Sequence, residues 1–274
     1  MGEIKQVGRR ALLKGMAGVA IGGAGGGAGL AAVLADPKLA RAAAAGLEDV
    51  ALTLSDGTAV GAALALPEGA SADTPVPSVV LIHEWWGLND QIKAVAAEFA
   101  KQGYGALAID LMGGAVATSP DQARVQMQAV DPETASETCT AWIDWMRGRD
   151  ETTERLGTVG WCFGGGWSLN ASIATPVQAT VVYYGRVNKP ASELAGLAGP
   201  VLGHFATQDR FIDKQMVGGF VDAMAEAGKA LTVYWYEADH AFANPTGARY
   251  DEADAKLAWQ RTSSFFAQNL KGAG

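Results

Sequence analysis

The sequence predicts an α/β fold in which helices cover both faces of a mostly parallel β-sheet. From residue 47 onward, short apolar runs alternate with segments whose apolar residues recur every three to four positions. This alternation is typical of parallel strands joined by crossover helices. The chain has 274 residues, 49% hydrophobic and 18% charged, which suits one large globular domain. Because the pattern runs without an internal repeat or a linker, residues 46–274 are predicted to form that single domain.

The first two predicted strands form an antiparallel hairpin at the start of this domain. Residues 47–54 and 59–66 flank Ser55-Asp56-Gly57-Thr58, which is a turn signal. Continuous apolar runs predict further strands at residues 79–82, 104–111, 156–161, 178–184, 201–206 and 231–236. Apolar residues at helical spacing predict helices at residues 90–101, 133–147 and 163–174, within 211–227, and at 250–270.

Residues 1–45 read as an export signal rather than as part of the domain. Arg9-Arg10 is followed by two leucines and a lysine, and then by a weakly apolar Gly/Ala stretch from residue 15 to residue 33. This order is typical of a signal for the twin-arginine export machinery. The sites Ala40-Arg41-Ala42 and Ala43-Ala44-Ala45 suit a signal peptidase, so the mature protein would begin at about residue 43. Six glycines between Gly22 and Gly29 make a poor spanning helix, so cleavage or loose tethering is favoured over a stable membrane anchor. We therefore expect a periplasmic or secreted protein.

Composition argues against two classes of partner. The net charge of −8 comes without clustered Lys and Arg, which a nucleic-acid-binding surface needs to displace counterions. The two cysteines are 23 residues apart and have no Cys or His pair at zinc-ligand spacing. We therefore expect neither a nucleic-acid partner nor a structural metal.

A nucleophile motif lies between a predicted strand and a predicted helix. Gly160-Trp161-Cys162-Phe163-Gly164 has the pattern G-x-S-x-G with cysteine in place of serine. The turn is so tight that the positions flanking the nucleophile must lack side chains, and the helix N-terminus favours a thiolate and an oxyanion. Cys162 is therefore the predicted nucleophile. Cys139 shares an apolar helical stripe with Trp142 and is expected to be a core residue.

A thiol nucleophile needs a base, and the chain has three histidines. His240 follows the last predicted strand, where this kind of fold supplies its base, and is the predicted one. His83 ends a strand and His204 lies within one, so both are expected to be structural.

The acid that orients the base is expected after the strand that precedes the last one. Asp209 is in that place, which gives the chain order Cys162, Asp209, His240. Asp239 is the alternative because it adjoins His240, but adjacent side chains on an extended segment point apart. Asp110 and Asp213 are interpreted as sheet-end or surface carboxylates.

These motifs together resemble the dienelactone hydrolase family, also known as the carboxymethylenebutenolidases. The resemblance rests on His83-Glu84-Trp85-Trp86-Gly87-Leu88-Asn89, on Gly160 to Gly165, on Asp209 and on His240-Ala241-Phe242, and covers roughly residues 47–270. It implies an eight-stranded α/β-hydrolase core, no cofactor and a Cys/His/Asp triad.

The resemblance also implies roles around the nucleophile. Glu84 would contact the resting thiol and help to generate the thiolate, and the backbone N–H groups of Trp85 and Phe163 would form an oxyanion hole. Independently of the resemblance, Glu84 lies at the carboxyl end of a central predicted strand, where ligands gather in open α/β sheets. Its carboxylate either takes the proton of a neighbouring thiol or only caps a loop. Trp86 is expected either to line the substrate pocket or to serve packing.

One position departs from the family pattern. Members that cleave dienelactone hold the substrate carboxylate with arginines, one of them four residues after the catalytic histidine, where this chain has Asn244. Arg124 and Arg249 are the remaining candidates for binding substrate. We therefore expect hydrolysis of another small-molecule ester or lactone.

Other functions stay open at this point. A general carboxylesterase or thioesterase on the same scaffold is the alternative enzyme, and a binding protein that has lost turnover is the alternative of another class. A thiol redox protein is a third reading, but the chain lacks C-x-x-C.

Overall fold

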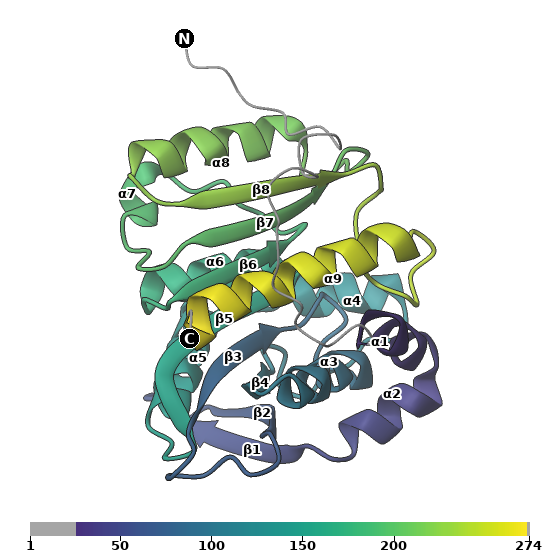
Figure 1. Ribbon diagram of the computed structural model, residues 1–274. Helices are drawn as coiled ribbons and strands as arrows, with labels where there is room; N and C mark the ends of the chain where they lie inside the picture. Colours follow the sequence, from purple (N-terminus) through teal and green to yellow (C-terminus); the bar gives the residue numbers. More distant parts are fainter. Residues whose placement is uncertain (1–25, 273–274) are drawn as a thin grey trace, which may run out of the picture.

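A computed structural model describes residues 26–272, in which the chain forms an eight-stranded sheet of order β1-β2-β4-β3-β5-β6-β7-β8 (Figure 1). Strands β1 and β2 form an antiparallel hairpin and β2 pairs antiparallel with β4, whereas all later pairings are parallel. The strands are β1 Glu48–Thr53, β2 Ala59–Ala65, β3 Val76–Ile82, β4 Gly105–Ile109, β5 Thr152–Trp161, β6 Ala179–Tyr183, β7 Val201–Ala206 and β8 Leu231–Tyr236. The predicted fold class is confirmed.

Helices cover both faces of the sheet, and Figure 1 shows α3 and α9 in front of it with α5 and α6 behind. The helices are α1 Gly26–Ala35, α2 Pro37–Ala44, α3 Asp90–Lys101, α4 Pro120–Gln128, α5 Pro132–Arg147, α6 Phe163–Ala174, α7 Ala191–Leu194, α8 Lys214–Glu226 and α9 Glu252–Phe266, and α9 continues into a π-turn at Ala267–Lys271. A central strand therefore buries both of its faces. Alternate residues of β3 enter different cores, with Val79 and Leu81 on one side and Val80 and Ile82 on the other.

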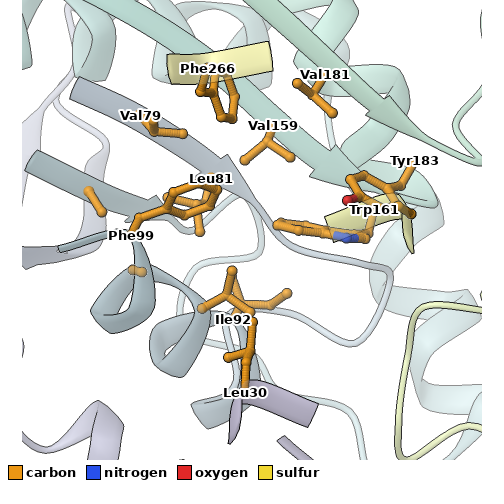
Figure 2. Close-up of a cluster of buried hydrophobic side chains, with 14 of the residues drawn as sticks. Leu30, Val79, Leu81, Ile92, Phe99, Val159, Trp161, Val181, Tyr183 and Phe266 are labelled. Atoms are coloured by element: carbon orange, nitrogen blue, oxygen red, sulfur yellow. The ribbon is translucent and has the colours of Figure 1, made fainter. Parts of the chain in front are cut away.

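The core between the sheet and helices α1, α3 and α9 lies beside the candidate site. Figure 2 shows strand residues of this core facing Ile92 and Phe99 of α3 and Phe266 of α9. Trp161, the last residue of β5, also belongs to this core. The elbow that follows Trp161 is thus built on a fully packed strand, which gives it a rigid base.

Four helices were not expected from the sequence. Helix α4 begins with Ser119 as N-cap and Pro120 at its first position, which is a helix-start signal that could have been recognised. Helix α7 is only four residues long. Helices α1 and α2 fall in the segment interpreted as the export signal.

The first two helices pack against the domain. Leu30 and Leu34 of α1 and Ala40 of α2 are buried in the same core as α3 and α9. Arg9 and Arg10 lie outside the described residues, so the export signal stays a prediction. Of the helices between residues 26 and 272, none is long and apolar enough to span a membrane.

Candidate active site

Cys162 stands at the sharp turn between β5 and α6. Its backbone has φ 54° and ψ −115°, a region that non-glycine residues rarely adopt and that costs about 1–3 kcal/mol. The flanking glycines explain how the turn closes: a Cβ on Gly160 would lie 1.9 Å from the carbonyl oxygen of Gly164, and one on Gly164 would lie 2.2 Å from that of Ile82. The surrounding backbone therefore enforces the strained conformation, which presents the thiol at the carboxyl ends of the strands.

A continuous series of contacts leads from this thiol to a buried carboxylate. His240 Nε2 lies 3.1 Å from Cys162 Sγ, and His240 Nδ1 lies 2.7 Å from Asp209 Oδ2. The other oxygen of Asp209 accepts hydrogen bonds from the backbone N–H groups of Phe211 (2.7 Å) and Ile212 (3.0 Å). Asp209 follows β7 and His240 follows β8, so two neighbouring parallel strands bring these side chains together.

The charges of this series reinforce one another. Burial opposes protonation of His240, but the hydrogen bond to Asp209 and the contact with Cys162 raise its pKa to about 10. Burial likewise opposes ionisation of Asp209, but the hydrogen bonds and charge of His240 hold its pKa below the usual range. An imidazolium beside sulfur is the arrangement that favours a thiolate nucleophile.

Glu84 lies next to this series, buried after the end of β3. Its carboxylate accepts hydrogen bonds from Asn244 Nδ2 at 2.5 Å and from the hydroxyl of Tyr184 at 3.4 Å, and burial raises its pKa. The resemblance implied a contact between Glu84 and the resting thiol, whereas here the thiol contacts His240 and the carboxylate contacts Asn244 and Tyr184. Asn244, noted from the sequence only as a missing arginine, is thus a direct partner of Glu84.

Tyr184, which follows β6 directly, is a residue of this site that was not expected from the sequence. Its ring packs edge-on against His240 with centroids 5.2 Å apart, and its hydroxyl reaches Glu84. Its φ of 36° is one of the positive values at non-glycine residues. A polar residue directly after a central parallel strand is the signal that could have identified it.

The two backbone N–H groups expected to form the oxyanion hole belong to Phe163 and Trp85. Phe163 is the first residue of α6, so its N–H has no acceptor within the helix. Trp85 follows Glu84, and its carbonyl oxygen accepts a hydrogen bond from Gln126 of α4 at 2.7 Å, which holds the loop. The ring of Trp85 packs edge-on against that of Trp86, and both are half-buried.

The remaining candidates around the site have other partners. Asp239 accepts a hydrogen bond from the backbone N–H of His240 at 2.6 Å and lies 3.6 Å from Arg249, so it does not orient the imidazole. Arg124 pairs with Asp121 on its own helix, and its side chain is 58% exposed. Both arginine side chains are therefore exposed, but Arg249 lies in the same loop as His240 whereas Arg124 lies on α4.

The other histidines and the second cysteine are buried in packed surroundings. His83 lies between the carbonyl oxygen of Glu84 and the N–H of Leu111. His204 contacts the hydroxyls of Tyr236 and Thr262, and burial lowers its pKa to about 3. Cys139 is fully buried, which raises its pKa to about 12. The structural interpretation of these residues agrees with their contacts.

The last two carboxylates accept backbone hydrogen bonds. Asp110 accepts from the N–H groups of Met112 and Gly114, and Asp213 caps the N-terminus of α8. Among residues 26–272, no three His, Cys, Asp or Glu side chains are grouped to hold a metal ion.

Comparisons with known proteins bear on the fold and the family of this chain. The sequence model of the dienelactone hydrolase family matches residues 60–270. The carboxymethylenebutenolidase of Pseudomonas putida is 29% identical over 235 residues, which cover 80% of this chain and 96% of that protein. Carboxymethylenebutenolidase 1 of Cupriavidus pinatubonensis is 24% identical over 230 residues, 80% of this chain and 96% of that protein. A dienelactone hydrolase-like promiscuous phosphotriesterase from metagenomic libraries shares the fold, with a TM-score of 0.74 at 23% identity over 82% of this chain and 99% of that one.

Proposed function

The chain belongs to the dienelactone hydrolase family, and we propose that it cleaves an ester or lactone with Cys162 as nucleophile. The observation that carries this proposal is the unbroken series of contacts from Cys162 through His240 to Asp209. A nucleophile, a base within hydrogen-bond reach and a carboxylate that orients the base are together what acyl transfer requires.

The proposed reaction has two halves. In the first, the Cys162 thiolate attacks the ester carbonyl, the C–O bond to the leaving group breaks, and the imidazolium of His240 protonates the departing alkoxide. In the second, His240 takes a proton from water, the resulting hydroxide attacks the thioester, and the acid leaves while Cys162 returns to the thiolate. The N–H groups of Trp85 and Phe163 would stabilise the oxyanion in both halves.

Glu84 has a supporting role in this proposal. Burial raises its pKa, which makes the ionised carboxylate a stronger base, and its hydrogen bonds are to Asn244 and Tyr184 rather than to the thiol. Movement of Glu84 toward Cys162 when substrate enters would supply a second acceptor for the thiol proton.

The proposed substrate is uncharged at the position where dienelactone has its carboxylate. Asn244 is neutral, and its amide is already bonded to Glu84. Trp86 is proposed to contact the substrate, and Arg249, paired with Asp239 at 3.6 Å, is the candidate partner for a charged substrate group. Exposed Arg124 is the second candidate.

Substitution of Cys162 tests the proposal. C162A should leave the fold intact and lower kcat for p-nitrophenyl acetate to less than about a tenth, because nucleophile loss costs several kcal/mol. The matched control is C139A, whose thiol is buried away from the site and whose variant should keep near wild-type turnover. Burst release of p-nitrophenol by the wild type, absent from C162A, would indicate the acyl-enzyme. Hydrolysis that survives in C162A would exclude Cys162 as nucleophile.

We also propose export by the twin-arginine route to the periplasm or beyond. Folding before export would shield the free thiol of Cys162 from oxidation. The double variant R9K/R10K should leave precursor in the cytoplasm, measured by fractionation and activity. Unchanged periplasmic activity of that variant would contradict the route.

A further inference from the structure

A cavity extends from the candidate site toward the N-terminal helices. It is a pocket of about 80 Å³, enough for several water-sized groups, between α1, α3, α9 and the loop after His240. Its walls are largely apolar and include Leu30, Leu34, Ile92, Trp161 and Trp259. Figure 2 shows Leu30 facing Ile92, with Trp161 at the end of its strand.

The polar end of this pocket is the neighbourhood of the nucleophile. Glu84, Tyr184 and Asn244 line it; Glu84 contacts the other two, and the ring of Tyr184 packs against that of His240. Glu252 and Lys256 of α9 are exposed and line the pocket elsewhere. The apolar walls of the pocket therefore end at three polar residues, one of which, Tyr184, packs against the ring of His240.

Helix α1 is held in place as a wall of this pocket. The side-chain amide of Gln91 donates to the carbonyl oxygen of Leu34 at 2.9 Å and to Thr246 Oγ1 at 3.1 Å. Thr246 Oγ1 in turn donates to Asn244 Oδ1 at 2.9 Å, and Asn244 donates to Glu84. Four hydrogen bonds thus connect the end of α1 to the carboxylate beside the nucleophile.

The residues that build this wall lie outside the part of the chain that the family model matches, which is 60–270. Leu30 and Leu34 are nevertheless buried, and removal of these apolar side chains from water stabilises the packed position of α1. The wall therefore comes from residues that precede the matched region.

We propose that this pocket binds the apolar acyl chain of an ester substrate, with α1 as its outer wall. The inference rests on the proposed function, and it names the substrate class as an uncharged ester with an acyl chain of several carbons. An anionic chain is disfavoured because the walls along the chain are apolar and the pocket ends at the Glu84 carboxyl, while Glu252 and Lys256 offset each other in charge. Processing near residue 43 would remove α1 and with it the preference for such chains.

The test fills the pocket from two helices. Ala31 of α1 and Ala255 of α9 both line the pocket and are half-buried, so A31W and A255W would each occupy it. Ala32 and Ala253 are exposed on the same two helices, which makes A32W and A253W matched controls with the same change in helix propensity. All variants are made in the full chain, and intact mass verifies that the N-terminal segment is present.

The measurement is the ratio of kcat/KM for p-nitrophenyl hexanoate to that for p-nitrophenyl acetate. A31W and A255W should each lower this ratio at least about tenfold, which corresponds to about 1.4 kcal/mol of lost chain binding, whereas both controls should keep the wild-type ratio. A wild-type ratio in either pocket variant would overturn the proposal. Where tryptophan prevents folding, leucine at the same position must shift the ratio in the same direction.

The result is independent of a failure of the proposed function. If C162A hydrolyses the acetate ester as well as the wild type does, the nucleophile assignment fails. If hydrolysis depends on Cys162 but the hexanoate-to-acetate ratio of the pocket variants equals that of the wild type, only the pocket assignment fails.

Discussion

Replacing Asp209 by asparagine should impair catalysis through the tautomer of His240. In D209N the amide oxygen can still accept the hydrogen bonds from the N–H groups of Phe211 and Ile212, which leaves the NH₂ group facing His240 Nδ1. Nδ1 must then accept a hydrogen bond, so the proton of the neutral ring moves to Nε2, which faces Cys162. A ring in that tautomer cannot take a proton from the thiol.

The expected loss follows from this contact. A hydrogen bond to a charged carboxylate contributes about 1.5–3 kcal/mol, and its removal alone corresponds to about a tenfold to 150-fold loss of kcat. With the wrong tautomer added, we expect a loss of at least about a hundredfold. The pKa of His240, about 10 in the wild type, should also fall toward its ordinary value in D209N because the carboxylate no longer stabilises the imidazolium.

The assay is steady-state hydrolysis of p-nitrophenyl acetate from pH 5 to pH 10, with thermal unfolding to verify the fold. The matched control is D239N, because Asp239 caps the N–H of His240 and pairs with Arg249 without touching the ring. Its effect should stay within about threefold, as for other exposed ion pairs. Greater damage from D239N than from D209N would show that the acid is misassigned.

Three further predictions concern specificity and stability. Dienelactone should be cleaved with a kcat/KM about tenfold to a hundredfold below that of neutral esters of similar size, because Asn244 lacks the charge of an arginine; equal activity would show that Arg249 or Arg124 binds the carboxylate. Because the pKa of buried His204 is about 3 when folded and about 6.5 when unfolded, the unfolded state binds more protons between these values, and stability should fall as pH drops through this window. Between pH 7.5 and pH 5 the free energy of unfolding, measured in urea, should fall by about 2 kcal/mol, and H204Q should lack this decrease. An equal decrease in H204Q would show that His204 is not its source. G164A should lower the free energy of unfolding by about 1–3 kcal/mol or more, since its Cβ would meet the Ile82 carbonyl oxygen at 2.2 Å. The control G218A, in open space on α8, should leave the free energy of unfolding unchanged or raise it. A wild-type urea midpoint for G164A would refute the steric argument.

The local pattern of the sequence was sufficient for most of the fold. Helices α3 and α6 and strands β7 and β8 have the predicted bounds, because each is a strongly periodic or continuous apolar segment whose ends carry turn or cap residues. Helix α1 was not predicted as part of the fold because its Gly/Ala composition resembles an export signal. Its packing depends on Leu30 and Leu34 meeting α3 and α9, which lie far along the chain.

The sequence by itself determined the nucleophile motif and the order of Cys162, Asp209 and His240, since the tight elbow demands glycines at fixed spacing and each of the other two residues follows a strand. Only the tertiary structure decided which groups meet. The carboxyl ends of β3, β6 and β8 bring Glu84, Tyr184 and the His240 loop together, although these segments are separated by up to 160 residues. Contacts of that range depend on strand order and side-chain packing, which short-range periodicity does not encode.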